Sequence, residues 1–257
     1  MIGSDILSGM RLWRVWGRWA WLDVKQRYRR SVIGPLWTTI SIGVTVVGIG
    51  SVFSILWGVK VAALMPHLAT GLILWTFLTS VVVEGTGVFA NNADVIKSIN
   101  LPLSIHVFRF IGNICILFAH NAIIYVFVVF IFDVPVGWSL LLVIPGLILY
   151  LLNALWVVLV LGVVCARYRD IPQVIQNIMV LLFFITPIFW FAESLGSAQA
   201  IVNYNVMAHF VDMVRLPLLG GRPVPETWMV VGAVTVCGWA FALPFYEHKR
   251  RGTPNWL

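Results

Sequence analysis

The sequence has 257 residues, of which 60% are hydrophobic and only 11% are charged, and its mean hydropathy is +0.95. A soluble domain carries about 25% charged residues, so this composition excludes a soluble enzyme and indicates a multi-pass membrane protein. The net charge of +7 does not indicate nucleic acid as a partner, because the cations gather in short segments beside apolar runs instead of forming one basic face.

Residues 5–28 are predicted to form an amphipathic helix that lies in the cytoplasmic membrane interface. At about 100° per residue, one narrow stripe carries only cations, namely Arg11, Arg14, Arg18 and Lys25. The opposite side carries Ile6, Trp13, Trp16 and Ala20. Cations toward headgroups and tryptophans toward acyl chains are typical of interface helices. A simple flank of the first span is the alternative, and the regularity of the stripe favours the helix.

Six apolar runs follow, each long enough to cross a hydrocarbon core about 30 Å thick as a helix: residues 33–57, 68–90, 103–132, 138–165, 174–192 and 227–246. With both termini in the cytoplasm, only Lys60, Arg215 and Arg222 of the 17 Lys and Arg residues would lie outside. The positive-inside rule therefore predicts one all-α domain over residues 1–257. It has a cytoplasmic interface helix in 1–30, six spans in 31–247 and a basic, exposed cytoplasmic tail in 248–257.

Two segments between the spans are predicted to form further helical structure. The inner loop 91–102, NNADVIKSINLP, carries Asp94 in its first turn and ends at Pro102, which predicts a short helix across the inner surface. The outer segment 193–226 contains an apolar core that is too polar to span cleanly. We expect a re-entrant segment there, between the fifth and sixth spans.

The motifs that would indicate catalysis or cofactor binding are missing from the sequence. It contains no H-E-x-x-H, C-x-x-C or G-x-S-x-G pattern and no G-x-x-x-x-G-K-[ST] loop. We therefore expect this chain to bind no metal, cofactor or nucleotide. Glu84 in the second span is either a functional site or a snorkelling carboxylate paired with a cation such as Arg109, and the second interpretation is favoured.

Five short segments match one known family in order and spacing: RYRRSVIGPLW at 27–37, NADVIKSINLP at 92–102, RDI at 169–171, TPI at 186–188 and NWL at 255–257. With them the chain resembles, over nearly its whole length, the membrane-spanning subunits of type-2 ABC exporters. The resemblance is to those that export lipid-linked O-antigen, capsule or teichoic acid polymers. One departure is Asn205, which is followed by Val206 where the family often has proline.

The resemblance implies a homodimer in the bacterial inner membrane with two copies of a separate ABC ATPase beneath it. This chain would then be no enzyme, and the partner would bind ATP and Mg. The substrate would be a polysaccharide carried on a polyprenyl diphosphate lipid. Residues 92–102, which we call the docking segment, would dock into the ATPase. They would couple ATP hydrolysis to export through Asn92, Asp94, Lys97, Asn100, Leu101 and Pro102.

Two further groups of residues are candidates for substrate contact. Aromatic rings stack on sugar faces without demanding a particular sugar, so six are candidates to line the translocation path: Phe53, Trp57, Phe183, Phe184, Phe189 and Trp190. Packing or lipid-facing positions are the alternative. The cations Arg27, Arg29 and Arg30 are candidates to attract the diphosphate of the lipid, with plain anchoring to membrane lipids as the alternative.

Other functions remain open at this point. An ABC exporter for a small molecule or drug is the nearest alternative, and RYRRSVIGPLW with the amphipathic N-terminal helix favours the polysaccharide branch. An intramembrane enzyme acting on a lipid-linked sugar would use Glu84 with His106. A passive channel would conduct without nucleotide.

Overall fold

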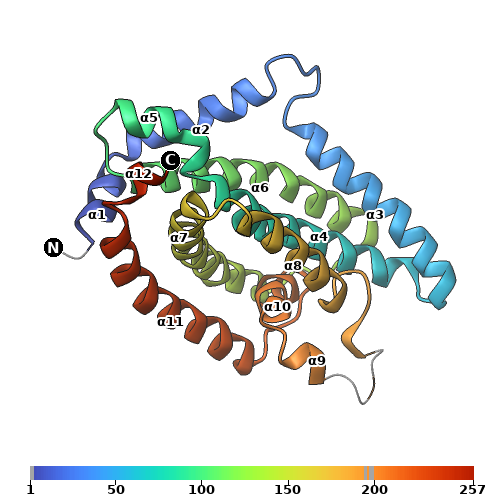
Figure 1. Cartoon of the computed structure of the whole chain (residues 1–257). Coiled ribbons are helices and arrows are strands. Elements are labelled where there is room, and N and C mark those ends of the chain that lie inside the picture. Colours follow the sequence, from blue (N-terminus) through green and yellow to red (C-terminus); the bar gives the residue numbers. More distant parts are fainter. Residues whose placement is uncertain (1–2, 194–195, 197–199) are drawn as a thin grey trace.

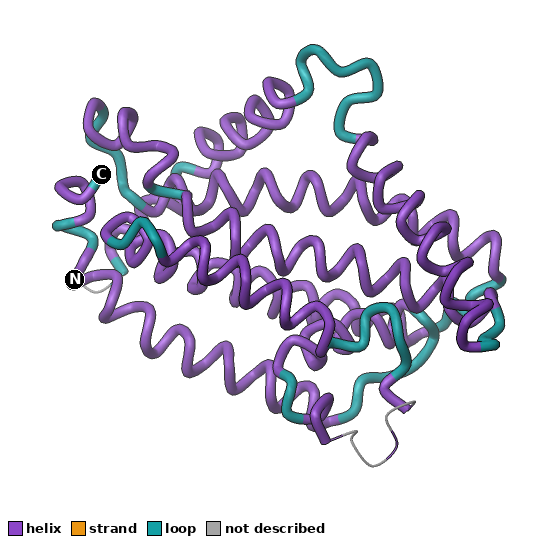
Figure 2. The backbone as a smooth tube through the Cα atoms, turned by 45° about the vertical axis from the view of Figure 1, so that its right-hand side comes forward, coloured by secondary structure: helices purple, strands orange, loops and turns teal. Residues whose placement is uncertain are grey.

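The computed structural model describes residues 3–193, 196 and 200–257. Every regular element in these residues is a helix (Figure 1), which confirms the predicted all-α class. The long helices form one bundle, and both chain ends lie at the same end of it (Figures 1 and 2). We call this the terminal end and call the opposite end, where the short helix α10 lies, the α10 end.

Five helical segments of the described chain are long and apolar enough to cross a membrane. They are α3 (Leu36–Trp57), α4 (Val61–Val83) continued by the 3-10 turn η1 (Glu84–Gly87), α6 (Ser104–Phe132), α7 (Val143–Arg167) preceded by the 3-10 turn η3 (Trp138–Leu142), and α11 (Pro225–Lys249). They coincide with five of the six predicted runs. The chain is therefore a multi-pass membrane protein by length and composition of its helices.

The predicted fifth span, 174–192, is only partly helical. Helix α8 (Ile171–Ile185) has 15 residues, and at 1.5 Å per residue it is about 22 Å long, less than the hydrocarbon core of about 30 Å. It ends because Thr186 precedes Pro187, and the residue before proline is disfavoured in the helical region. Thr186 has φ −85° and ψ 134°, so the chain leaves the helix there instead of kinking within it.

Helix α4 is the centre of the bundle. In the 18-residue apolar stretch of this span 72% of the residues are buried, against 17–39% in the corresponding stretches of the other four candidate spans. It packs against α3, α6, α7, α8 and α10, so its neighbours surround it. The outer faces of the other long helices expose apolar side chains, which suits contact with lipid.

At the terminal end, the predicted amphipathic helix is two helices, α1 (Ser4–Arg11) and α2 (Trp13–Arg27), separated at Leu12. Helix α2 lies across α6, where Trp16 and Ala20 pack against Gly112. The side chain of Trp13 is turned outward and is 61% exposed. The apolar side that the sequence predicts as one stripe is therefore only partly packed within α2, where Trp16 and Ala20 contact α6 and Trp13 is exposed.

Asp5 of α1 joins three segments of the terminal end. Its carboxylate accepts hydrogen bonds from the backbone amides of Leu103 (3.1 Å) and Ser104 (2.9 Å), at the start of α6. It also accepts one from the hydroxyl of Tyr246 in α11 (2.7 Å) and lies 3.5 Å from Nη1 of Arg250. The side chain is 7% exposed, so this is a buried charge of α1 whose polar partners come from the start of α6 and the end of α11.

Candidate functional site

The predicted docking segment forms η2 (Ala90–Asn92) and α5 (Ala93–Ser98) at the terminal end of the bundle. Its residues fall into two groups. Asp94, Lys97 and Asn100 are exposed, and their side chains make no hydrogen bond or ion pair within the described part of the chain. Asn92, Leu101 and Pro102 are partly buried and connect α5 to the bundle. The first group is therefore free to contact a partner, whereas the second positions it.

The C-terminal tail supports this segment instead of extending away from it. Residues Thr253–Trp256 form α12, which packs against α5 and α7. The side chain of Trp256 lies 5.2 Å from the guanidinium carbon of Arg167 as a cation–π contact, and Thr253 is fully buried. The basic tail that the sequence predicts as exposed is thus partly packed against α5 and α7.

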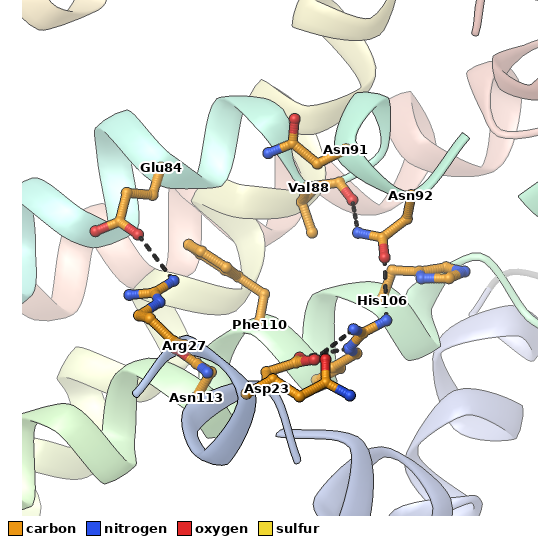
Figure 3. Close-up of a pocket in the computed structure, with 11 residues that line it drawn as sticks. Asp23, Arg27, Glu84, Val88, Asn91, Asn92, His106, Phe110 and Asn113 are labelled. Atoms are coloured by element: carbon orange, nitrogen blue, oxygen red, sulfur yellow. Dashed lines mark hydrogen bonds and ion pairs between the residues drawn. The ribbon is translucent and has the colours of Figure 1, made fainter. Parts of the chain in front are cut away.

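A polar hollow of about 350 Å³ lies beside the docking segment, between α2, η1, η2 and α6 (Figure 3). On one side of it, Asp23 accepts two hydrogen bonds of 2.6 Å from Arg109, and Asn92 accepts a third of 3.0 Å. On the other side, Arg27 lies 3.9 Å from Glu84. The cation that pairs with Glu84 is therefore Arg27 and not Arg109, because Asp23 occupies Arg109.

The other residues predicted to act at this end, Arg29, Arg30 and His106, do not join the ion pair of Arg27 and Glu84. Arg29 and Arg30 are exposed in the loop after α2 and make no ion pair within the described residues. His106 also lines the hollow but lies on the opposite side from Glu84 (Figure 3). The separation of Glu84 and His106 argues against their acting as a catalytic pair.

The six aromatic residues predicted for the translocation path converge on one cluster, centred on Phe189. The Phe189 ring lies 5.6 Å from the rings of Phe53 and Phe183. It lies 6.2 Å from the ring of Phe184 and 6.5 Å from that of Trp57. Trp190 joins the cluster by donating an indole hydrogen bond to the carbonyl of Phe184 (3.2 Å). We call these six residues the aromatic cluster.

The aromatic cluster has an open side. Phe184 is 60% exposed and Trp57 is 44% exposed, so these two rings are available to a molecule outside the chain. The cluster joins α3 to the end of α8 and to the turn that follows α8. It exists because α8 stops at Ile185, which lets Phe189 turn back between the rings of α3 and α8.

A buried cation holds that turn in place. Arg215 of α10 (Val206–Leu218) is 4% exposed, and its guanidinium donates a hydrogen bond to the carbonyl of Pro187 and pairs with Asp212. Its Nη1 also lies 3.0 Å from Nε2 of His67, which lies 3.1 Å from the carbonyl oxygen of Trp190. Arg215 therefore binds the backbone carbonyl of Pro187, before Phe189, and His67 lies against the backbone carbonyl of Trp190, after it.

Asn205 makes a second connection to this turn. Its side chain caps α10 by accepting from the amide of Met207 (2.9 Å) and donates to the hydroxyl of Thr186 (3.0 Å). Asn205 is therefore the N-cap of α10, although Val206 follows it where the related family often has proline. A capping asparagine supplies the missing hydrogen-bond acceptor that the first amides of a helix need.

One bundle with five helices long and apolar enough to cross a membrane, within the described chain, defines a multi-pass membrane protein. Residues 16–219 match the family of ABC-2 type transporters. This match covers most of the chain, and the protein belongs to the ABC-2 type transporter family, as the sequence resemblance predicts.

Two similar proteins are O-antigen export system permease proteins RfbA. The one from Myxococcus xanthus is 20% identical over 237 residues, which is 89% of each chain. The one from Klebsiella pneumoniae is 23% identical over 197 residues, which is 74% of each chain.

Proposed function

We propose that this chain is the membrane-spanning subunit of an ATP-driven exporter that moves a polyprenyl-diphosphate-linked polysaccharide across the bacterial inner membrane. The O-antigen export function of both relatives supports the substrate class. The observation that carries the proposal is the aromatic cluster, since rings offered by two helices and a turn suit successive sugar faces.

The proposed assembly is a homodimer with two ABC ATPase subunits on the cytoplasmic side. The terminal end is then cytoplasmic, because it carries α5 and most of the cations. Helix α8 together with the turn after it would form the short fifth of six spans. Helix α10 would form the re-entrant segment, since its buried Arg215 is covered by protein on the α10 end.

The first experiment is recovery of the detergent-solubilised chain from its native host, with mass spectrometry of the bound proteins. We expect an ATPase with a phosphate-binding loop at equal stoichiometry. The complex should export a lipid-linked polysaccharide from the inside of reconstituted vesicles only with ATP. Export of a drug instead of the glycan would favour the small-molecule alternative. Turnover or conduction by the chain alone would contradict the proposal.

Replacing Lys97 or Asn100 by alanine is expected to uncouple ATP hydrolysis from export. Both side chains are exposed and make no contact that stabilises the fold, so the protein should insert and fold normally. ATP hydrolysis by the reconstituted complex should continue while export falls. Lys60→Ala, an exposed lysine at the α10 end, is the matched control and should export normally. Normal export by both docking variants would show that the coupling contact lies elsewhere.

Replacing Phe189 by alanine is expected to lower glycan export about two- to tenfold, since each aromatic stacking contact contributes about 0.5–1.5 kcal/mol. Phe189 is the ring that contacts four others of the cluster. The measurement is the initial rate of ATP-dependent export in vesicles. Phe241→Ala removes one ring of a stacked pair with Phe245 on α11 and should leave export unchanged. Equal losses in both variants would assign Phe189 a packing role only.

A further inference from the structure

Two hollows near the terminal end share a wall. The first is the polar hollow of about 350 Å³ between α2, η1, η2 and α6 (Figure 3). The second, of about 170 Å³, lies between α3, α4 and α6. Arg27 and Glu84 line both hollows. Their ion pair therefore stands where the first hollow meets the second.

This ion pair is loose, whereas its neighbour is tight. The closest nitrogen and oxygen of Arg27 and Glu84 are 3.9 Å apart, and the side chains are 49% and 47% exposed. No hydrogen bond joins them in the described chain. Beside them, Asp23 and Arg109 make two hydrogen bonds of 2.6 Å and are 24–28% exposed. An incoming anion would therefore displace Glu84 from Arg27 far more readily than Asp23 from Arg109.

Glu84 stands at an electrostatically unfavourable position without Arg27. It is the C-cap of α4, where the α-helix gives way to the 3-10 turn η1. The partial charge at a helix C-terminus is negative, so it repels a carboxylate. A change from α to 3-10 geometry within one long helical segment is also a common hinge position. The Glu84 side chain is thus held at the wall mainly by Arg27.

The second hollow is lined by polar groups, although it lies among apolar helices. Thr38, Thr76, Ser80 and Asn121 contribute hydroxyls and an amide to it. The hydroxyls of Thr38 and Thr76 donate to the backbone carbonyls of Pro35 and Leu72 at 2.8 Å, whereas the Ser80 hydroxyl makes no hydrogen bond within the described residues. The amide nitrogen of Asn121 makes no hydrogen bond within the described residues, so it is free to donate to an anion. Polar residues inside spans commonly mark a substrate pathway.

We propose that Arg27 and Glu84 form a gate for the phosphate headgroup of a lipid-linked substrate. A phosphate of the headgroup replaces Glu84 as the partner of Arg27, and Glu84 leaves the wall. The headgroup then passes from the first hollow toward the Ser80 hydroxyl and the Asn121 amide of the second. Arg27 is the binding residue, and Glu84 is the competitor that keeps the wall closed in the absence of substrate. This inference rests on the proposed function for its choice of lipid.

The test is binding of polyprenyl diphosphate without a glycan to the full-length chain in nanodiscs of neutral phosphatidylcholine. Glu84→Gln keeps the shape of the side chain and removes the competing charge, so we expect the affinity to rise at least threefold. Arg27→Gln should lower it at least tenfold. The matched control is Arg18→Gln, which removes an exposed arginine of α2 that has no ion pair among the described residues and should change the affinity less than twofold.

Two other binding results would contradict the gate, and a separate export measurement distinguishes its failure from that of the proposed function. A lower or unchanged affinity of Glu84→Gln would show that Glu84 does not compete for Arg27. Equal displacement of the probe by phosphatidylglycerol would show that the site takes any phosphate lipid and does not select the substrate. Binding with the expected dependence on Glu84, in a complex that exports no glycan, would keep the gate and overturn the proposed function.

Discussion

Replacing Asp5 by alanine is expected to destabilise the folded chain by about 3–5 kcal/mol, the range found when one partner of a buried ion pair is removed. The carboxylate satisfies the amides of Leu103 and Ser104 and the hydroxyl of Tyr246, and it faces the charge of Arg250. Alanine leaves the two amides and the hydroxyl without this acceptor in a buried place, whereas Arg250 keeps Glu247 as a partner. Tyr246→Phe removes a single hydrogen bond and should cost about 0.5–1.5 kcal/mol.

The measurement is thermal unfolding in detergent followed by labelling of cysteine thiols. Cys165 is buried and Cys115 is partly buried, whereas Cys237 is exposed, so a Cys237→Ser background reports on unfolding. Asp5→Ala should lower the unfolding temperature clearly. Asp94→Ala removes an exposed carboxylate on α5 and should leave it unchanged. Unfolding of Asp5→Ala at the temperature of the parent would contradict the assigned contacts.

Asp5 also connects the docking segment to α1 and α11, which bears on the coupling of ATP hydrolysis to export. Leu103 directly follows the docking segment, and Asp5 binds its amide. Movement of α5 under an ATPase would therefore reach α1 and α11 through one carboxylate. We expect Asp5→Asn, which keeps the size of the side chain, to lose part of the coupling between ATP hydrolysis and export in reconstituted vesicles. Full coupling in this variant would limit Asp5 to a role in stability.

Replacing Arg215 by methionine is expected to release the turn that carries Phe189 and to abolish export. The change removes the donor to the carbonyl of Pro187 and the contact with His67, and it leaves Asp212 without its cation. The loss of stability should again be about 3–5 kcal/mol. Glycan export and thiol-labelled unfolding measure the two effects.

The control for this substitution is Arg222→Met. Arg222 is an exposed arginine that follows α10 and should tolerate methionine in both assays. If Arg215→Met exports glycan at the rate of the parent, the turn does not need its buried cation and the aromatic cluster is held by ring packing alone.

Several features of the fold follow from local sequence. The apolar runs predict the long helices, because a helix in lipid satisfies its backbone hydrogen bonds within itself and needs only enough consecutive apolar residues. The aromatic residues at 53–57 and 183–190 could be selected from the sequence because ring chemistry depends on residue type. The end of α8 at Ile185 could also be anticipated from Pro187, because the residue before a proline is disfavoured in the helical region.

Other features depend on contacts between distant residues, and no local pattern indicates them. Asp5 lies 98 residues before Leu103 and 241 before Tyr246, so only the packing of α1 against α6 and α11 shows that it is buried. Arg215 is an ordinary outer-loop cation in the sequence. The only signal in the chain is its place within a short apolar stretch, where a charge is costly unless it is paired.

The sequence by itself determined the helical class, the apolar segments, the short helix within residues 91–102 and the family, since each depends on residue type and spacing along the chain. Only the tertiary structure decided which charges pair. Arg109 was free to pair with Glu84 in the sequence, but α2 crosses α6 and places Asp23 on Arg109, leaving Arg27 for Glu84. Ion pairing falls off within a few ångströms, so the crossing of two helices, and not the order of residues, selects the partners.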